Sequence, residues 1–148
     1  MNHESQPHVA RLDTDELSRL FALGCLGWVV DAGRLEGYLL GFLDDAPYDG
    51  EEFRWFRSSI ARPFLYVDQV AIATDARRKG IGAQLYDHVF RWSREKGMAS
   101  VCCEVNLRPA NPDSLRFHER LEFEKLAELD TADGRRVALL NRLLTPHS

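Results

Sequence analysis

One stretch of the sequence, residues 64–92, constrains the fold more than any other, because an apolar strand, a basic glycine loop and a helix follow one another without interruption. Residues 64–73 are mostly apolar over the length of a strand, and residues 74–76 end the run. The loop at residues 77–82 then places three cations and two glycines directly before the helix. Unpaired backbone N–H groups and the positive end of the helix dipole favour an anion at such a position. The stretch therefore predicts a phosphate-binding site.

Two well-known phosphate-binding loops fit this stretch poorly. A Walker A loop needs Gly-Lys-Ser/Thr, but the order here is Lys79-Gly80, and no hydroxyl follows to hold magnesium. A Rossmann fingerprint needs a third glycine where Leu85 stands, although Glu104 does lie about twenty residues further on, as that fold requires of its ribose-binding acid. A dinucleotide-binding reductase therefore remains the weakest alternative, and a basic turn that only caps a surface helix also stays open.

A third interpretation rests on a family resemblance. Arg77-x-x-Gly80-x-Gly82 resembles the acyl-CoA pyrophosphate loop of the GNAT acetyltransferase superfamily, Arg/Gln-x-x-Gly-x-Gly/Ala. Residues 111–123 are similar to that superfamily's later motif, Asn-x-x-Ala-x-x-Phe/Leu-Tyr-x-x-x-Gly-Phe, with His118 in place of the tyrosine and Glu122 in place of the glycine. The resemblance covers roughly residues 64–125. It implies an α+β fold: a twisted, mixed and mostly antiparallel sheet of about six to seven strands, flanked by helices, with splayed middle strands.

The rest of the chain provides elements that suit this fold. Before the central stretch, the pattern predicts a short strand at 9–12, a helix from Asp13 or Thr14 to Gly24, a β-hairpin with arms at 26–30 and 35–43, and a short helix at 51–61. After it come a strand at 100–106, a helix that Asn111 and Pro112 begin, and a second hairpin with arms at 123–129 and 135–144. An antiparallel hairpin so early is unusual in a doubly wound dinucleotide fold, where strands and helices alternate.

Composition limits the class of protein. With 148 residues, we expect residues 1–148 to form a single domain. The net charge of -4 argues against nucleic acid as the main partner and is compatible with a cationic amine. No apolar stretch is long enough to cross a membrane and no secretory signal begins the chain, which predicts a cytoplasmic protein without membrane contact. The three cysteines have no metal-ligand spacing, so we expect reduced, buried thiols and no metal.

The resemblance also assigns a cosubstrate, acetyl-CoA, and the residues that bind it. The backbone N–H groups of residues 78–83 would hold the pyrophosphate with help from the nearby cations, and a main-chain N–H of Val70 or Ile72 would polarise the thioester carbonyl. The predicted acetyl-CoA contacts are Val70, Ala71, Ile72, Arg77, Arg78, Lys79, Gly80, Ile81, Gly82, Ala83, Asn111, Ser114 and Phe117.

Catalytic residues follow from the sequence and the resemblance together. Glu104 is an acid in an otherwise apolar strand, where burial would raise its pKa and improve it as a base. It matches the general base of the ribosomal-protein N-terminal acetyltransferases in this superfamily, while Asp68 is the rival base and a surface carboxylate paired with arginine stays open. His118 occupies the slot of the usual proton donor, where Glu122 could hold its ring charged, but a neutral ring would instead act as a base or a hydrogen-bond partner. Tyr86 is a second donor candidate.

The acceptor side is predicted in residues 44–62, where acidic and aromatic residues alternate. Tyr48, Trp55 and Asp68 are the predicted substrate contacts, because carboxylates hold an ammonium group and aromatic rings add a cation–π attraction. Packing of these aromatic residues on the sheet or on a partner subunit is the alternative, and a homodimer is expected.

The hypothesis is therefore an acetyl-CoA-dependent N-acetyltransferase. It would act on a primary amine, either a small molecule or a peptide N-terminus, by direct transfer in a ternary complex without a metal or an acyl-enzyme. The alternative is a catalytically silent acyl-CoA-binding regulatory or interaction module, because the usual tyrosine is replaced at His118.

Overall fold

The computed structural model describes residues 22–31, 33–76 and 79–145. The predicted strand at 9–12 and most of the helix predicted to end at Gly24 lie outside them. In chain order the elements are β1 (Leu26–Asp31), β2 (Leu35–Leu43), α3 (Glu51–Ser59), β3 (Phe64–Ile72), the short 3-10 helix η1 (Thr74–Ala76), α4 (Ile81–Glu95), β4 (Ser100–Arg108), α5 (Pro112–Arg120), β5 (Glu124–Asp130) and β6 (Arg136–Leu143).

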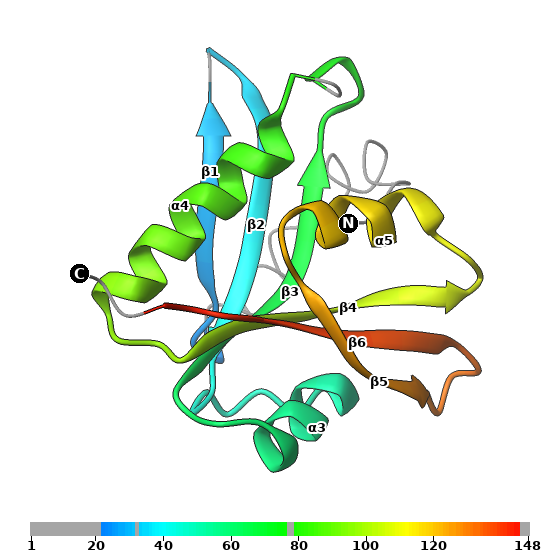
Figure 1. The fold of residues 1–148 in the computed structure, drawn as a ribbon. Helices are drawn as coiled ribbons and strands as arrows, with labels where there is room; N and C mark the ends of the chain where they lie inside the picture. Colours follow the sequence, from blue (N-terminus) through cyan, green and yellow to red (C-terminus); the bar gives the residue numbers. More distant parts are fainter. Residues whose placement is uncertain (1–21, 32, 77–78, 146–148) are drawn as a thin grey trace.

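The six described strands form one sheet in the order β1-β2-β3-β4-β6-β5. Every neighbouring pair is antiparallel except β3 and β4, which run parallel and pair only at Phe64–Ser100, Leu65–Val101 and Tyr66–Cys102. Both strands continue for six more residues but separate, so that the sheet opens into a fork (Figure 1). The predicted α+β fold with splayed middle strands is confirmed.

A β-bulge in β3 lies just beyond the point of separation. Leu40 of β2 pairs with Gln69, but its neighbour Gly41 pairs with Val67, which leaves Asp68 as the extra residue. A Cβ on Gly41 would come within 2.8 Å of the carbonyl oxygen of Tyr66, so only glycine allows the two backbones to approach this closely. Because the bulge inserts one residue, it reverses which main-chain groups of β3 face the fork.

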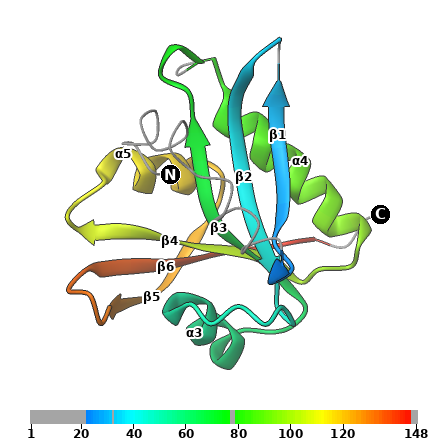
Figure 2. The ribbon, with the colours of Figure 1, turned by 180° about the vertical axis from the view of Figure 1, so that it is seen from behind.

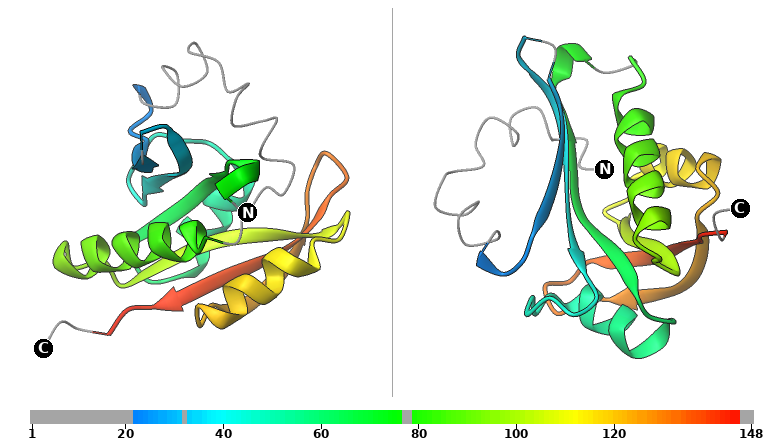
Figure 3. Two further views of the ribbon diagram at one scale, coloured as in Figure 1. Left: turned by 90° about the horizontal axis from the view of Figure 1, so that it is seen from above. Right: turned by 90° about the vertical axis from the view of Figure 1, so that its left-hand side faces the viewer.

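The two faces of the sheet are covered by different helices. Helices α4 and α5 lie on one face and α3 lies on the other, as the views from behind and from the side show (Figures 2 and 3). Each face has its own apolar core, with Leu85 and Val89 of α4 in the first and Phe53 and Phe56 of α3 in the second. Among the described helices, none is long and apolar enough to cross a membrane.

The helix ends follow local sequence signals. Asn111 begins α5 and its side-chain oxygen accepts a hydrogen bond from the Ser114 N–H at 3.3 Å, with Pro112 in the first helical position as predicted. Gly80 begins α4 with φ 76°, the left-handed conformation that glycine adopts without strain. Unlike Asn111, it provides no side chain to cap the helix.

Candidate active site

The start of α4 presents main-chain N–H groups. Its N-cap residue, Gly80, makes no side-chain cap hydrogen bond, and the N–H groups in the first turn of an α-helix have no partner within the helix. Among the described residues, nothing lies within 4 Å of a Cβ built on Gly80. Lys79 stands beside it with an ammonium group 3.2 Å from Glu36, Ile81 and Gly82 are buried, and Ala83 is exposed. Arg77 and Arg78 lie outside the described residues.

The main chain of β3 presents donors to the fork. The N–H of Ala73 donates to the Glu36 carbonyl oxygen of the β2 side at 2.8 Å. Because main-chain groups alternate in direction along a strand, the N–H groups of Ile72 and Val70 point away from β2, toward the gap beside β4. The bulge at Asp68 produces this arrangement, and the predicted residue between them, Ala71, faces β2 instead.

Glu104 lies at the point where the fork opens, two residues beyond the last β4 residue that pairs with β3. Its Oε1 accepts a hydrogen bond of 2.6 Å from the hydroxyl of Tyr66, the last paired residue of β3. Burial, followed by the charges of Glu52 and Asp68, raises the pKa of Glu104 to about 8, and the Tyr66 hydrogen bond opposes this rise. The carboxyl therefore releases and accepts a proton near neutral pH.

Three carboxylates and two tyrosines gather around this position on the α3 face. The hydroxyl of Tyr48 donates to Asp68 at 2.9 Å, and its ring lies 6.4 Å from that of Tyr66. Glu52, in the first turn of α3, is buried and its charge acts on Glu104. Of the predicted substrate contacts, the structure brings Tyr48 and Asp68 together. Trp55 lies instead edge-to-face on Phe56, with ring centres 5.3 Å apart.

His118 and Tyr86 lie on the opposite face of the sheet, inside the core. The Tyr86 hydroxyl is 2.8 Å from His118 Nε2, and His118 Nδ1 is 2.7 Å from the Ser114 carbonyl oxygen. Since a carbonyl only accepts, Nδ1 carries the proton and Nε2 accepts from Tyr86. Burial is the main cause that lowers the pKa of His118 to about 3, so the ring is neutral at physiological pH.

Glu122, the predicted partner of a charged His118 ring, is not in contact with that ring. Glu122 is exposed, has φ 69° and lies 3.7 Å from Arg142. The His118 ring is therefore not positively charged. A catalytic role for the neutral ring stays a prediction. The predicted acetyl-CoA contacts of α5 have structural roles here, since Asn111 caps the helix and Phe117 packs with its ring centre 6.0 Å from that of Tyr86.

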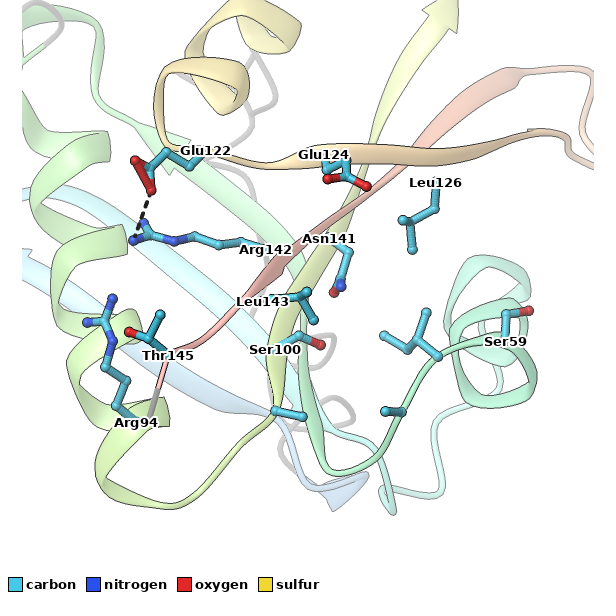
Figure 4. Close-up of a pocket in the computed structure, with 13 residues that line it drawn as sticks. Ser59, Arg94, Ser100, Glu122, Glu124, Leu126, Asn141, Arg142, Leu143 and Thr145 are labelled. Atoms are coloured by element: carbon cyan, nitrogen blue, oxygen red, sulfur yellow. Dashed lines mark ion pairs between the residues drawn. The ribbon is translucent and has the colours of Figure 1, made fainter. Parts of the chain in front are cut away.

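A cavity of about 480 Å³ lies at the closed end of the fork, where β4 begins (Figure 4). Arg94, Arg142 and Asn141 line it, together with the exposed side chains of Leu126 and Leu143. None of the predicted catalytic or substrate residues lines this cavity. The predicted base, Glu104, lies instead at the open end of the fork.

Three residues that surround Glu104 were not among the predicted site residues. Tyr66 lies two residues before Asp68 in a strand, and period-two alternation would have indicated a shared face. Glu52 belongs to the acidic segment that predicted the acceptor side. Arg135, which contacts Glu52, follows a turn 83 residues away, and no sequence signal connects the two.

The three cysteines are free and buried, as predicted. Burial raises the pKa of Cys25 to about 11 and of Cys103 to about 12, and the pKa of Cys102 rises as well. All three thiols therefore stay protonated at neutral pH. Within the described residues, no group of three or more His, Cys, Asp or Glu could hold a metal ion.

Known proteins share this architecture. The fold is similar to Ard1 from Thermoplasma volcanium (23% identity over 77% of this chain and 66% of that chain, TM-score 0.59). It is also similar to the ribosomal-protein-alanine N-acetyltransferase from Brucella melitensis (20% identity over 88% of this chain and 75% of that chain, TM-score 0.63). A third similar structure is NAA60 from Arabidopsis thaliana in complex with acetyl-CoA (17% identity over 97% of this chain and 96% of that chain, TM-score 0.67).

Sequence comparison identifies the family directly. No curated protein sequence matches the chain. The model of the acetyltransferase (GNAT) family, however, matches residues 2–123, which is well over half of the chain. The chain therefore belongs to the acetyltransferase (GNAT) family of acyltransferases, as the resemblance predicted.

Proposed function

We propose that this protein transfers an acetyl group from acetyl-CoA to the nitrogen of a primary amine, with both substrates bound at the same time. The observation that carries the proposal is the position of Glu104 at the opening of the fork, with its pKa raised to about 8. One sheet face offers main-chain donors beside Gly80, and the other offers carboxylates. The two substrates would thus approach from opposite faces and meet in the gap.

Residues of the first face would hold acetyl-CoA, which supplies the acyl group as a thioester. The N–H groups at the start of α4 fit the pyrophosphate, because a helix N-terminus favours negative charge and no described residue lies within 4 Å of a Cβ built on Gly80. A donor such as the N–H of Val70 or Ile72 fits the thioester carbonyl, and its contribution to the transition state would be about 3 kcal/mol.

Residues of the second face would bind the amine and remove its proton. Asp68 and Glu104 attract an ammonium group, and the tyrosine rings beside them add a cation–π attraction. Glu104 accepts a proton from the nitrogen as the new N–C bond forms and the C–S bond breaks. Because the cysteine thiols stay protonated, direct transfer does not compete with an acylated cysteine.

The leaving thiolate needs no strong acid, because a thiol has a pKa of about 8.5, and it can take its proton from water. Burial raises the pKa of Tyr86 far above its usual value, so the phenol keeps its proton and donates a hydrogen bond to neutral His118. Roles of Tyr86 and His118 as proton donors stay predictions from the sequence. A small molecule and a peptide N-terminus both fit the acceptor role, and a homodimer and a cytoplasmic location stay predictions from the sequence.

The proposal is tested by binding and turnover measured separately. Isothermal titration calorimetry should show micromolar binding of acetyl-CoA, and thiol release over a panel of amines should identify an acceptor. Absence of binding to any short-chain acyl-CoA would end the proposal. Binding without turnover on small amines and peptide N-termini would favour the second candidate, a silent acyl-CoA-binding module, which the neutral imidazole at His118 also makes plausible.

A further inference from the structure

The turn between β5 and β6 docks on the first turn of α3, beside the carboxylate cluster. The N–H of Ala132 donates to Glu51 Oε1 at 3.1 Å. The Arg135 guanidinium donates from Nη2 to Glu52 Oε2 at 3.2 Å and from Nη1 to Asn106 Oδ1 at 3.1 Å. One cation thus connects the turn, α3 and β4.

The guanidinium is held in place before any substrate arrives. Its Nε donates to both carboxylate oxygens of Asp133, at 3.0 and 3.2 Å. The main chain of Arg135 is fixed as well, because its N–H donates to Thr131 Oγ1 at 3.1 Å and its carbonyl accepts from the Thr131 N–H at 2.8 Å. A cation ordered in this way loses little freedom when it pairs with a carboxylate.

The partners of Arg135 lie on both sides of Glu104. Asn106 is two residues further along β4 and therefore shares the face of Glu104. Glu52 approaches from α3, and its side chain is only 11% exposed, against 34% for Arg135. A carboxylate this deeply buried raises the free energy of any negatively charged neighbour unless a cation offsets it. Arg135 is that cation.

We propose that Arg135 is a positioning residue for Glu104: by pairing with Glu52 and Asn106 it holds α3 against β4 and offsets the charge of Glu52 beside Glu104. The inference rests on the proposed function in one respect, that Glu104 is the general base. Arg135 itself would contact neither substrate.

Other ionisable groups also influence the ionisation of Glu104. From each packed element of the described chain they are Tyr66 and Asp68 of β3, Tyr48 of the segment before α3, Glu52 of α3, Tyr86 of α4, and Cys102 and Cys103 of β4 itself. All of these groups are acids. Arg135 is the cation that pairs with one of them.

A titration of Glu104 tests the proposal without any substrate. The chain is labelled with ¹³C at the glutamate carboxyl carbon, and the Glu104 signal is assigned by its loss in Glu104→Gln. In Arg135→Met the titration midpoint should rise by about one pH unit, because Glu52 then carries an uncompensated charge. Arg135→Lys should keep the midpoint near that of the wild type. Arg136→Met is the matched control, since its exposed side chain pairs with Glu128 and Asp130.

A double variant shows whether Arg135 acts through Glu52. Glu52→Gln alone should lower the midpoint, and Arg135→Met combined with Glu52→Gln should titrate close to Glu52→Gln. An unchanged midpoint in folded Arg135→Met would overturn the proposal. If that variant does not fold, an unchanged midpoint in Glu52→Gln overturns it equally.

Turnover then separates this inference from the proposed function. If Glu104 is the base, the acidic limb of the kcat/KM profile should move to higher pH in Arg135→Met by the same amount as the titration midpoint. Midpoints that shift as expected while Glu104→Gln keeps full turnover would support the role of Arg135 and refute Glu104 as the base.

Discussion

The two faces of the forked sheet are built in contrasting ways. On the α4 face, the groups offered to a ligand are main-chain N–H groups at Gly80 and along β3, and the side chains beneath them, His118 and Tyr86, are sealed in the core. On the α3 face, the offered groups are side chains, with Glu104 and Asp68 supported by tyrosine hydroxyls. The first face suits a ligand that main-chain groups hold, and the second suits one that side chains hold.

The largest expected effect is on turnover. Glu104→Gln should lower kcat by roughly 10²–10⁴-fold, because an amide cannot accept the amine proton. Acetyl-CoA affinity measured by calorimetry should stay within about twofold of the wild type, since Glu104 lies on the other face. Glu119→Gln, on the exposed side of α5, is the matched control. A parallel loss of acetyl-CoA affinity in Glu104→Gln would show that the faces are not independent.

A difference in stability should separate the two faces next. Tyr86→Phe leaves the buried Nε2 of His118 without its donor and should reduce the free energy of unfolding by about 2 kcal/mol. Tyr48→Phe removes a hydroxyl from the half-buried α3 side, where water replaces it, and should reduce that free energy by less than about 1 kcal/mol. Urea denaturation of both variants measures the difference, and equal losses would contradict the distinction between a sealed and an open face.

The main-chain site should respond to backbone conformation. Gly80→Val should weaken acetyl-CoA binding about tenfold, because a β-branched residue strains the left-handed conformation that presents the first N–H groups of α4. Gly80→Asn is the control, since asparagine tolerates this conformation and also adds a Cβ. Calorimetry on both variants distinguishes the two causes. Equal losses of acetyl-CoA affinity would indicate that the added side chain obstructs the ligand and that the backbone conformation at Gly80 does not determine the affinity.

The last effect is a pH dependence of stability on the α3 face. The pKa of Glu104 in the folded chain, about 8, lies above its value in the unfolded chain. The unfolded state therefore releases this proton first, and the stability contributed by the protonated carboxyl is present below about pH 4.5 and lost as the pH rises to 8. Glu104→Gln should lack this loss. Its melting temperature should exceed that of the wild type more at pH 9 than at pH 4, and a constant difference would contradict the raised pKa.

Prediction from the sequence succeeded where the information is local. The glycine loop, the helix that Asn111 and Pro112 begin and both hairpins depend on neighbouring residues, and all were found close to their expected positions. The raised pKa of Glu104 was predicted for the same reason, because Glu104 is a lone acid in an apolar strand. The charge state of His118 stayed open, because the pKa of an imidazole depends on burial, and burial is decided by helices that pack from elsewhere in the chain.

The sequence by itself determined the family and the order of the strands and helices along the chain, since local patterns of residues carry both. Only the tertiary structure decided which acids meet at the fork. The bulge at Asp68 sets the direction of the β3 main chain, and the turn at Arg135 reaches back to α3 across most of the chain. The physical reason is that side chains converge through strand register and helix packing, which no short run of residues encodes.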